Sequence, residues 1–310
     1  EMVCVESDDL GKAARLEDAP GRYIEFCKAS VDRQFRLAGL KVVIDCAHGA
    51  TYHIAPRVFE ELGADVRLIG VQPDGTNINA QCGSTHPETL AVEVLKAGAD
   101  LGIAFDGDGD RVVMVDGQGE VVDGDELLYI IARHRAEAGS LGGGVVGTVM
   151  SNFGLERALA ALNIPFARAK VGDRYVLECL RARGWRLGGE TSGHLLCLDL
   201  TTTGDAIVAA LQALVPLIES GRSLAELKQG MHKLPQVMVN VGADNPAAVA
   251  ENTQVQAAVA DTAQLLQGRG RVLVRPSGTE PVIRVMVEGE DSAEVTTLAE
   301  NLAAAVEQGT

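Results

Sequence analysis

Aromatic residues and positive charge are both scarce in this sequence of 310 residues. Only 4 % of the residues are aromatic, so any core must be built mainly from the aliphatic members of the 46 % that are hydrophobic. The 27 Lys and Arg residues face 43 Asp and Glu residues, which gives a formal net charge of −16. A surface of this sign repels nucleic-acid phosphates and anionic membranes, so we expect neither as a partner. A small phosphorylated ligand remains compatible if cations are concentrated locally.

The sequence also lacks closely spaced cysteines, long apolar runs and a leader pattern. No cysteine lies within three residues of another, which excludes the pairs typical of zinc and redox sites and suits a reducing cytosol. No apolar run is long enough to span a bilayer, and the acidic N-terminus does not resemble a signal peptide. We therefore expect a cytoplasmic protein. Because the chain begins with Glu1 and not with Met, we also expect a further segment upstream. The cysteines are Cys4, Cys27, Cys46, Cys82, Cys179 and Cys197.

Runs of β-branched residues alternate with helical patterns along most of the chain. Residues 40–46, 66–69 and 101–105 predict buried strands, and residues 54–62 and 87–97 predict the helices between them. This order favours a parallel sheet with helices on both faces. A second cycle of the same kind follows, so we predict two related α/β domains with mixed, mainly parallel sheets. Its predicted helices are 125–137, 154–162, 174–183 and 206–219, and its predicted strands are 145–149, 166–170, 185–187 and 195–198.

The last part of the sequence has a different pattern, strand-helix-strand-strand-helix. This order predicts a small α+β domain with helices on one face of an antiparallel sheet. We expect a lead-in at residues 1–30, followed by domains at 31–120, 121–230 and 231–310. The predicted strands of the last domain are 236–241, 272–275 and 282–287, and its predicted helices are 252–266 and 293–306.

Three carboxylates alternate with glycines directly after the strand at 101–105, in the acidic loop Asp106-Gly107-Asp108-Gly109-Asp110-Arg111. Glycine lets the backbone fold tightly, so the carboxylates can converge. Two unit charges about 4 Å apart repel by roughly 4 kcal/mol at an effective dielectric of 20. Either the carboxylates point into water or a hard cation lies among them. Oxygen ligands at this density suit Mg²⁺, and the carboxyl end of a parallel strand is where α/β sheets bind ligands. We predict that Asp106, Asp108 and Asp110 bind one Mg²⁺.

A calcium-binding EF-hand loop begins in the same way but requires Gly at its sixth position and Glu at its twelfth. Those positions hold Arg111 and Gly117 here, and a strand precedes the loop where an EF-hand has a helix. The EF-hand is therefore excluded, and a solvated acidic turn remains the alternative. The similar run at residues 123–126, Asp-Gly-Asp-Glu, predicts the cap of a helix.

Two further loops carry groups that suit phosphate and sugar. The Arg275 loop, residues 275–280, reads Arg-Pro-Ser-Gly-Thr-Glu and offers a guanidinium fork, two hydroxyls and a possible nest of backbone amides. An ordinary hairpin turn is the alternative. The Glu190 loop, residues 189–194, reads Gly-Glu-Thr-Ser-Gly-His. Its Glu and hydroxyl side chains suit sugar hydroxyls, and its His could contact a substrate or move a proton. A loop that satisfies only its own polar groups is the alternative.

These three loops, in this order, resemble the α-D-phosphohexomutase family over essentially the whole chain. The acidic loop looks like the family's metal loop, the Glu190 loop like its sugar loop and the Arg275 loop like its phosphate loop. The stretches at 49–56, 169–176 and 278–289 are similar to members that act on glucosamine phosphates. The resemblance implies Mg²⁺-dependent interconversion of glucosamine 6-phosphate and glucosamine 1-phosphate, through a phosphoserine and a bisphosphorylated sugar.

The resemblance also implies roles for single residues. It implies that the first domain binds metal, the second sugar and the third phosphate. Arg111 and His194 are its candidates for catalysis. The residues that it implies for the sugar are Glu190, Ser192 and His194, and those for the phosphate that is not transferred are Arg275, Ser277, Gly278 and Thr279.

The family's phosphoserine lies in a Ser-His-Asn-Pro type motif, and no histidine of this sequence is followed by Asn-Pro. We therefore expect domains two to four of a four-domain enzyme, without turnover on their own. Three alternatives stay open from the sequence. The sugar could be a mannose or glucose phosphate, the chain could be a non-catalytic sugar-phosphate-binding protein, and it could form a homodimer.

Overall fold

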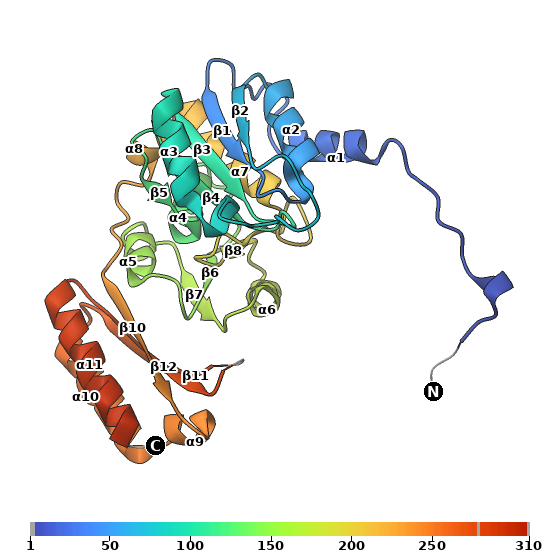
Figure 1. Ribbon diagram of the computed structural model, residues 1–310. Coiled ribbons are helices and arrows are strands. Elements are labelled where there is room, and N and C mark those ends of the chain that lie inside the picture. The colour runs from blue at the N-terminus through green and yellow to red at the C-terminus, as the bar shows by residue number, and fades with distance from the viewer. Residues whose placement is uncertain (1–3, 278–279, 309–310) are drawn as a thin grey trace.

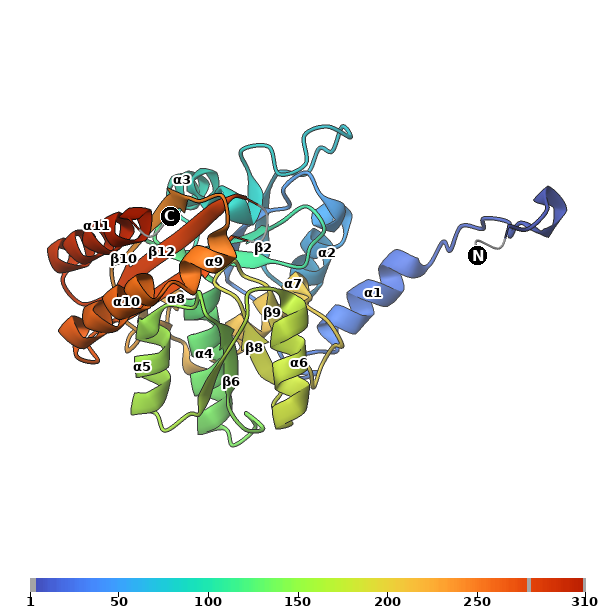
Figure 2. The same ribbon diagram turned by 90° about the horizontal axis from the view of Figure 1, so that it is seen from below.

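The computed structural model describes residues 4–277 and 280–308, which form three sheets of five, four and three strands. The two larger sheets lie together, and the small sheet with its helices lies beside the second of them (Figure 1). Residues 4–18 run away from this body before helix α1 (Ala19–Lys28) returns to it (Figures 1 and 2). No helix in the described ranges is long and apolar enough to cross a membrane. All six cysteines are free thiols.

The first sheet has the strand order β2-β1-β3-β4-β5. Its first three strands are parallel, as predicted, but β4 and β5 are antiparallel additions that the sequence analysis did not identify. The chain turns back at the acidic loop, so β4 forms a hairpin with β3. The strands are β1 (Lys41–Asp45), β2 (Asp65–Ile69), β3 (Leu101–Phe105), β4 (Val112–Asp116) and β5 (Val121–Val122).

Both faces of this sheet are covered because alternate strand residues point to opposite sides. Val43 packs on one face with Leu90 and Val94 of helix α3, whereas Ile44 belongs to the cluster on the other face with Phe59 of helix α2. The helices are α2 (Ala55–Glu61) and α3 (Pro87–Ala97), and short 3₁₀ turns occur at η1 (Ser7–Asp9), η2 (Ala50–His53) and η3 (Gly83–Thr85).

The second sheet has the order β7-β6-β8-β9, which repeats the arrangement of β2-β1-β3-β4. In both sheets a parallel strand is followed by an antiparallel partner, so β8 and β9 form the equivalent of the β3–β4 hairpin. The Glu190 loop therefore occupies the same topological position as the acidic loop. The elements are α4 (Gly124–Glu137), β6 (Val145–Thr148), α5 (Phe153–Ala161), β7 (Phe166–Ala169), α6 (Asp173–Arg183), β8 (Leu187–Gly189) and β9 (Leu195–Cys197).

Helix α7 (Ala206–Ser220) follows the second sheet but also packs on the first, where it contacts β4 and α1. Tyr23 of α1 donates to Asp205, which caps α7, and Gln212 donates to the carbonyl oxygen of Ser30. One apolar cluster consequently runs through both larger sheets. The short helix α8 (Leu224–Leu227) then leads to the C-terminal part.

The small sheet is antiparallel, with the order β10-β12-β11. Helices α10 and α11 lie together on one face of it (Figures 1 and 2). It has its own apolar core, separate from the cluster of the larger sheets. This arrangement confirms the predicted α+β unit and, with the two α/β sheets, the predicted fold class. The elements are β10 (Gln236–Gly242), α9 (Pro246–Ala250), α10 (Thr253–Leu266), β11 (Arg271–Pro276), β12 (Val282–Glu288) and α11 (Ser292–Gln308).

Candidate active site

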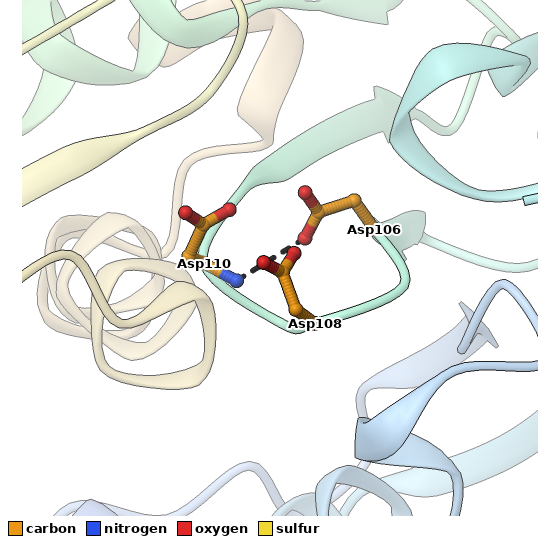
Figure 3. Close-up of side chains that lie close together, drawn as sticks. All are labelled: Asp106, Asp108 and Asp110. Atoms are coloured by element: carbon orange, nitrogen blue, oxygen red, sulfur yellow. Dashed lines mark hydrogen bonds between the residues drawn. The ribbon is translucent and has the colours of Figure 1, made fainter. Parts of the chain in front are cut away.

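The acidic loop folds back around one of its own carboxylates. Oδ1 of Asp106 accepts the backbone N–H groups of Gly109, Asp110 and Arg111, each at 3.1 Å. This ring of hydrogen bonds requires a tight turn, and Gly109 has a φ of 76°, in the region that favours glycine. Figure 3 shows the Asp106, Asp108 and Asp110 side chains arranged around this turn.

The three carboxylates lie close enough to share a cation. One ligand oxygen from each of Asp106, Asp108 and Asp110 lies within 4.8 Å of the others. Burial, together with the neighbouring Asp110 and Asp108 carboxylates, raises the pKa of Asp106 to about 6, although the hydrogen bond from the Arg111 N–H acts in the opposite direction. Oδ1 of Asp110 is buried and accepts no hydrogen bond from the described residues. A hard divalent cation would satisfy this oxygen and neutralise the cluster, so the residues fit Mg²⁺.

Other segments fix the acidic loop from behind. A Cβ atom at Gly49 would collide with the backbone of Gly107, and the N–H of Ala50 donates to the Gly107 carbonyl oxygen at 2.7 Å. On the other side, the N–H of Ala206 at the start of α7 donates to the Gly109 carbonyl oxygen at 3.1 Å. The loop is therefore held by the turn after β1 and by α7, which limits its freedom to rearrange.

The Glu190 loop meets the acidic loop directly. Arg111 and His194 form an antiparallel bridge, and the N–H of Val112 donates to the Gly193 carbonyl oxygen at 3.1 Å. Nδ1 of His194 lies 3.2 Å from Oδ2 of Asp110, and the His194 side chain is only 4 % exposed. His194 thus faces the carboxylate cluster.

Arg111 is the exposed cation of the site. Its Nε lies 3.7 Å from Oδ2 of Asp106 and 3.7 Å from Oδ1 of Asp110, while 45 % of its side chain is exposed. At these distances the guanidinium partly offsets the negative charge of the cluster and remains able to reach a ligand. This geometry is compatible with the catalytic role predicted for Arg111, and that role stays a prediction.

The side chains of the Glu190 loop point to different partners. Oε1 of Glu190 accepts the N–H of Gly172, in the turn before α6, at 2.8 Å. Thr191 donates its hydroxyl to Oδ2 of Asp125 at 2.8 Å, whereas Ser192 is exposed. The second carboxylate oxygen of Glu190 has no hydrogen-bond partner among the described residues. The sequence offered the Gly-Asp-Arg turn at residues 172–174 only as a weak signal, and it gave none for a role of Asp125 at this loop. In the structure Gly172 has a positive φ of 122°, which explains why a glycine begins this turn.

The Arg275 loop lies apart from the other two loops, on the small sheet. Arg275 on β11 pairs across the ladder with Arg284 on β12, and its Nε has no hydrogen-bond partner among the described residues. Burial, together with the Arg284 charge, lowers the pKa of the Arg275 guanidinium. Of these two neighbouring guanidinium groups, Arg284 donates to the carboxylate of Glu280. The excess of positive charge favours the binding of an anion at this end of the hairpin. The N–H of Ser277 donates to the Val282 carbonyl oxygen at 2.9 Å.

The structure therefore brings two of the three predicted loops into contact and places the third on another sheet. The residues predicted at Gly278 and Thr279 lie outside the described residues. The prediction of a helix cap at 123–126 is confirmed, because Asp123 and Glu126 form a reciprocal capping box at the start of α4.

Three sequence models of one family match the chain. They are described as Phosphoglucomutase/phosphomannomutase, alpha/beta/alpha domain II at residues 21–119, alpha/beta/alpha domain III at residues 123–234 and the C-terminal domain at residues 238–305. The chain belongs to the phosphoglucomutase/phosphomannomutase family, which confirms the resemblance of the three loops.

Curated relatives extend the match over nearly all of the chain. A phosphoglucosamine mutase of Cellvibrio japonicus is 61 % identical over 307 residues, which cover 99 % of this chain and 69 % of the relative. A phosphoglucosamine mutase of Legionella pneumophila (strain Paris) is 57 % identical over 302 residues, with coverages of 97 % and 66 %. The chain thus spans about two-thirds of the length of these relatives.

Solved structures share the fold at low sequence identity. A phosphoglucomutase/phosphomannomutase family protein from Burkholderia thailandensis superposes with a TM-score of 0.77 at 22 % identity, covering 94 % of this chain and 64 % of that one. An N-acetylphosphoglucosamine mutase of Aspergillus fumigatus, solved with GlcNAc-6P and magnesium, superposes with a TM-score of 0.75 at 21 % identity, with coverages of 94 % and 66 %.

Proposed function

We propose that this chain carries the metal, sugar and phosphate sites of a phosphoglucosamine mutase, which interconverts glucosamine 6-phosphate and glucosamine 1-phosphate. The observation that carries the proposal is the three-carboxylate loop joined directly to the Glu190 loop, at the carboxyl ends of equivalent strands in two related sheets. The identity of 61 % to a phosphoglucosamine mutase over 99 % of the chain supports the choice of an amino sugar.

Asp106, Asp108 and Asp110 would hold one Mg²⁺. When bound, the cation supplies a Lewis acid for a transferring phosphoryl group and offsets the negative charge that accumulates there. The protein's own contribution is to keep the three carboxylates in place before the substrate arrives. The amide hydrogen bonds to Asp106 and the contact of His194 with Asp110 serve this purpose.

Arg111 and His194 act on either side of the cluster. The exposed Arg111 guanidinium can donate to phosphoryl oxygens, which suits the geometry of an arginine fork. The buried His194 orients Asp110 through Nδ1, and its Nε2 has no hydrogen-bond partner among the described residues. We assign His194 the orientation of Asp110 in addition to the sugar contact expected from the sequence.

The substrate's sugar and its second phosphate are assigned to the other two loops. The free oxygen of Glu190 and the exposed Ser192 hydroxyl can accept and donate hydrogen bonds to sugar hydroxyls. Arg275, helped by the neighbouring Arg284 and by Ser277, would bind the phosphate that is not being transferred. Positioning of both ends in this way supplies much of the rate of a phosphoryl transfer.

Isothermal titration calorimetry in the presence of Mg²⁺ tests the proposal. Glucosamine 6-phosphate should bind, and glucose 6-phosphate and mannose 6-phosphate should bind at least about tenfold more weakly if the amino group is recognised. Equal affinities would favour a glucose or mannose phosphate mutase, and no binding of any of the three would refute the proposal. Arg275→Met should weaken all three ligands, whereas Arg36→Met, at an exposed position next to α1, should weaken none.

A further inference from the structure

Two buried carboxylates outside the proposed contacts, Asp125 and Glu288, accept adjacent backbone amides in the same loop. We infer that Asp125 and Glu288 are positioning residues that couple the Glu190 loop to the strand carrying Arg275, and so fix the spacing between the sugar and phosphate sites. The inference rests on the proposed function, because it concerns a ligand that must reach both loops at once. The segment that they share, residues 149–153, runs from the end of β6 to the first residue of α5 and is called the joint loop below.

Asp125 connects the Glu190 loop to the joint loop. Its side chain is 0 % exposed, and Oδ2 accepts both the Thr191 hydroxyl and the Asn152 N–H at 2.8 Å. A second link runs through the backbone, because the N–H of Gly124 donates to the Thr191 carbonyl oxygen at 3.1 Å. A shift of the Glu190 loop would therefore break hydrogen bonds to a buried carboxylate unless the joint loop moved with it.

Glu288 connects the joint loop to the small sheet. It is the last residue of β12 and is 0 % exposed, and Oε1 accepts the N–H of Phe153 at 2.9 Å. Its other oxygen, Oε2, accepts from Nε of Arg271 at 2.7 Å. Arg271 donates its remaining groups to the carbonyl oxygens of Val149 and Ser151, both at 2.7 Å. One ion pair of the small sheet thus holds both ends of the joint loop.

Arg271 lies at the start of β11, and Arg275 lies four residues further along the same strand. A β-strand is extended over this length. The position of Arg271 therefore also determines where Arg275 lies on the same strand. The chain of contacts from Thr191 through Asp125, Asn152 and the adjacent Phe153 to Glu288 and Arg271 is continuous. It joins the proposed sugar and phosphate sites although they lie on different sheets.

The covalent connection between the two units is fixed at the same place. Nδ2 of Asn152 donates to the Leu234 carbonyl oxygen at 3.1 Å, and the Leu234 N–H donates back to Oδ1 of Asn152 at 3.0 Å. A Cβ atom at Gly154 would collide with the His232 carbonyl oxygen, so the connecting segment lies directly on the start of α5. The N–H of Gly289 also donates to the Pro235 carbonyl oxygen at 3.1 Å.

Stability alone does not account for these groups. A buried ion pair or carboxylate contributes little net stability, because desolvation offsets its attraction, and apolar residues of the same size often do as well. Directional hydrogen bonds to single backbone amides, by contrast, define one relative position of the packed elements. A ligand that contacts Glu190 or Ser192 at one end and Arg275 at the other needs that position, since small misplacements are costly in a pre-organised site.

Hydrogen exchange and calorimetry on the whole chain test the coupling. Asp125→Ala removes the acceptor, whereas Asp125→Asn keeps one oxygen for the Asn152 and Thr191 donors and serves as the conservative rescue. The matched control is Asp116→Ala. Asp116 is 1 % exposed and accepts the amides of Gln118 and Glu120 in the β4–β5 hairpin. Its Oδ2 lies 3.4 Å from Nζ of Lys228, and among the described residues it makes no hydrogen bond to the joint loop. Glu288→Gln tests the other side of the joint loop.

In Asp125→Ala, amide exchange across β11 should become about tenfold faster or more, because the joint loop no longer holds Arg271 in one place. Affinity for glucosamine 6-phosphate should fall about tenfold in Asp125→Ala and in Glu288→Gln, while affinity for inorganic phosphate changes less than about twofold. Asp125→Asn should behave like the unmodified chain. Asp116→Ala should change exchange in its own hairpin and around its ion-pair partner Lys228, and should leave exchange in β11 unchanged.

Faster exchange confined to the Glu190 and joint loops would overturn the inference, as would an equal loss of affinity for inorganic phosphate and sugar phosphate. An effect of Asp116→Ala on β11 equal to that of Asp125→Ala would overturn it too, since the change would then be general loosening. If the unmodified chain binds no sugar phosphate, the proposed function fails. The exchange of β11 in Asp125→Ala then still shows whether the coupling exists.

Discussion

At the scale of single residues, the site depends on the groups that stabilise the clustered carboxylates at the end of β3. Asp106 is 6 % exposed and stays in place because three amides point at one of its oxygens. The alternation of Asp and Gly predicted this convergence, because glycine permits the turn and carboxylates at this density call for a cation. Asp125 could not be predicted in the same way. Its partners Asn152 and Thr191 are distant in sequence, and the run that contains it has the pattern of an ordinary helix cap.

Asp108→Asn should weaken Mg²⁺ binding without unfolding the protein. Asp108 is exposed, so the change to a neutral amide weakens one ligand but leaves the amide ring of Asp106 intact. We expect an affinity loss on the order of a hundredfold, with an unchanged melting temperature in the absence of metal. Titration calorimetry with Mg²⁺ measures the first and calorimetric melting the second. Asp65→Asn, at the exposed start of β2, is the matched control and should bind Mg²⁺ normally. Full-strength binding by Asp108→Asn would remove Asp108 from the ligand set.

The raised pKa of Asp106 predicts how stability without metal depends on pH. The pKa rises from 3.8 to about 6 on folding, mainly because of burial. A carboxyl group shifted in this direction contributes stability that is fully present below its unfolded pKa and is lost as the pH rises through about 6. Asp106→Asn should therefore lose less stability than the unmodified chain between pH values of about 4 and 7. Urea unfolding of the metal-free proteins across this range measures the difference. Parallel pH profiles of the two proteins would contradict the predicted shift.

At the scale of elements, hydrophobic periodicity predicted most of the helices and most of the strands, but not the short helices α8 and α9. Strands such as β3, in which every residue is buried, and helices such as α3, which begins at Pro87 and ends before the left-handed Gly98, carry their signals locally. The antiparallel strand β4 was missed because its apolar run follows the acidic loop, and that loop could equally have ended the first α/β domain. Its pairing with β3 depends on a backbone reversal that no local pattern specifies.

The close approach between the turn after β1 and the acidic loop gives a prediction at this scale. In Gly49→Ala the new Cβ would collide with the Gly107 backbone, so the acidic loop must shift. We expect a loss of stability of about 1–3 kcal/mol and weaker Mg²⁺ binding. Gly21→Ala in α1 is the matched control, because no described atom outside its own helix backbone lies within 4 Å of the new Cβ. That variant should gain about 0.5–1 kcal/mol from helix propensity. Unchanged metal affinity in Gly49→Ala would show that the contact does not position the loop.

At the scale of the whole molecule, the sequence predicted three domains, while the apolar cores form two larger groups. Helix α7 follows the second sheet in sequence but packs against β4 and α1, and one cluster runs through both larger sheets. Local sequence patterns cannot reveal this arrangement, because α7 packs against elements that are distant from it in the sequence. The boundaries expected at residues 120 and 230 remain predictions. The small sheet, with its own core, was the easier unit to recognise.

We therefore expect the chain to unfold as two cooperative units, the pair of larger sheets and the small sheet, and not as three. Leu211→Ala on α7 removes a fully buried side chain from the shared cluster and should lower the stability of both larger sheets together by about 2–5 kcal/mol. Leu302→Ala on α11 should lower only that of the small sheet. Hydrogen exchange resolved by segment measures both. If Leu211→Ala loosened the second sheet and left the first unchanged, the shared core would not be a cooperative unit.

The most direct test of the account is a crystal structure of this chain with Mn²⁺ in place of Mg²⁺ and with glucosamine 6-phosphate. The account predicts an anomalous difference peak among the carboxylates of Asp106, Asp108 and Asp110, with the sugar at Glu190 and Ser192 and a phosphate against Arg275. A metal peak away from the acidic loop, or a sugar phosphate bound without contact to the Glu190 and Arg275 loops, would contradict it.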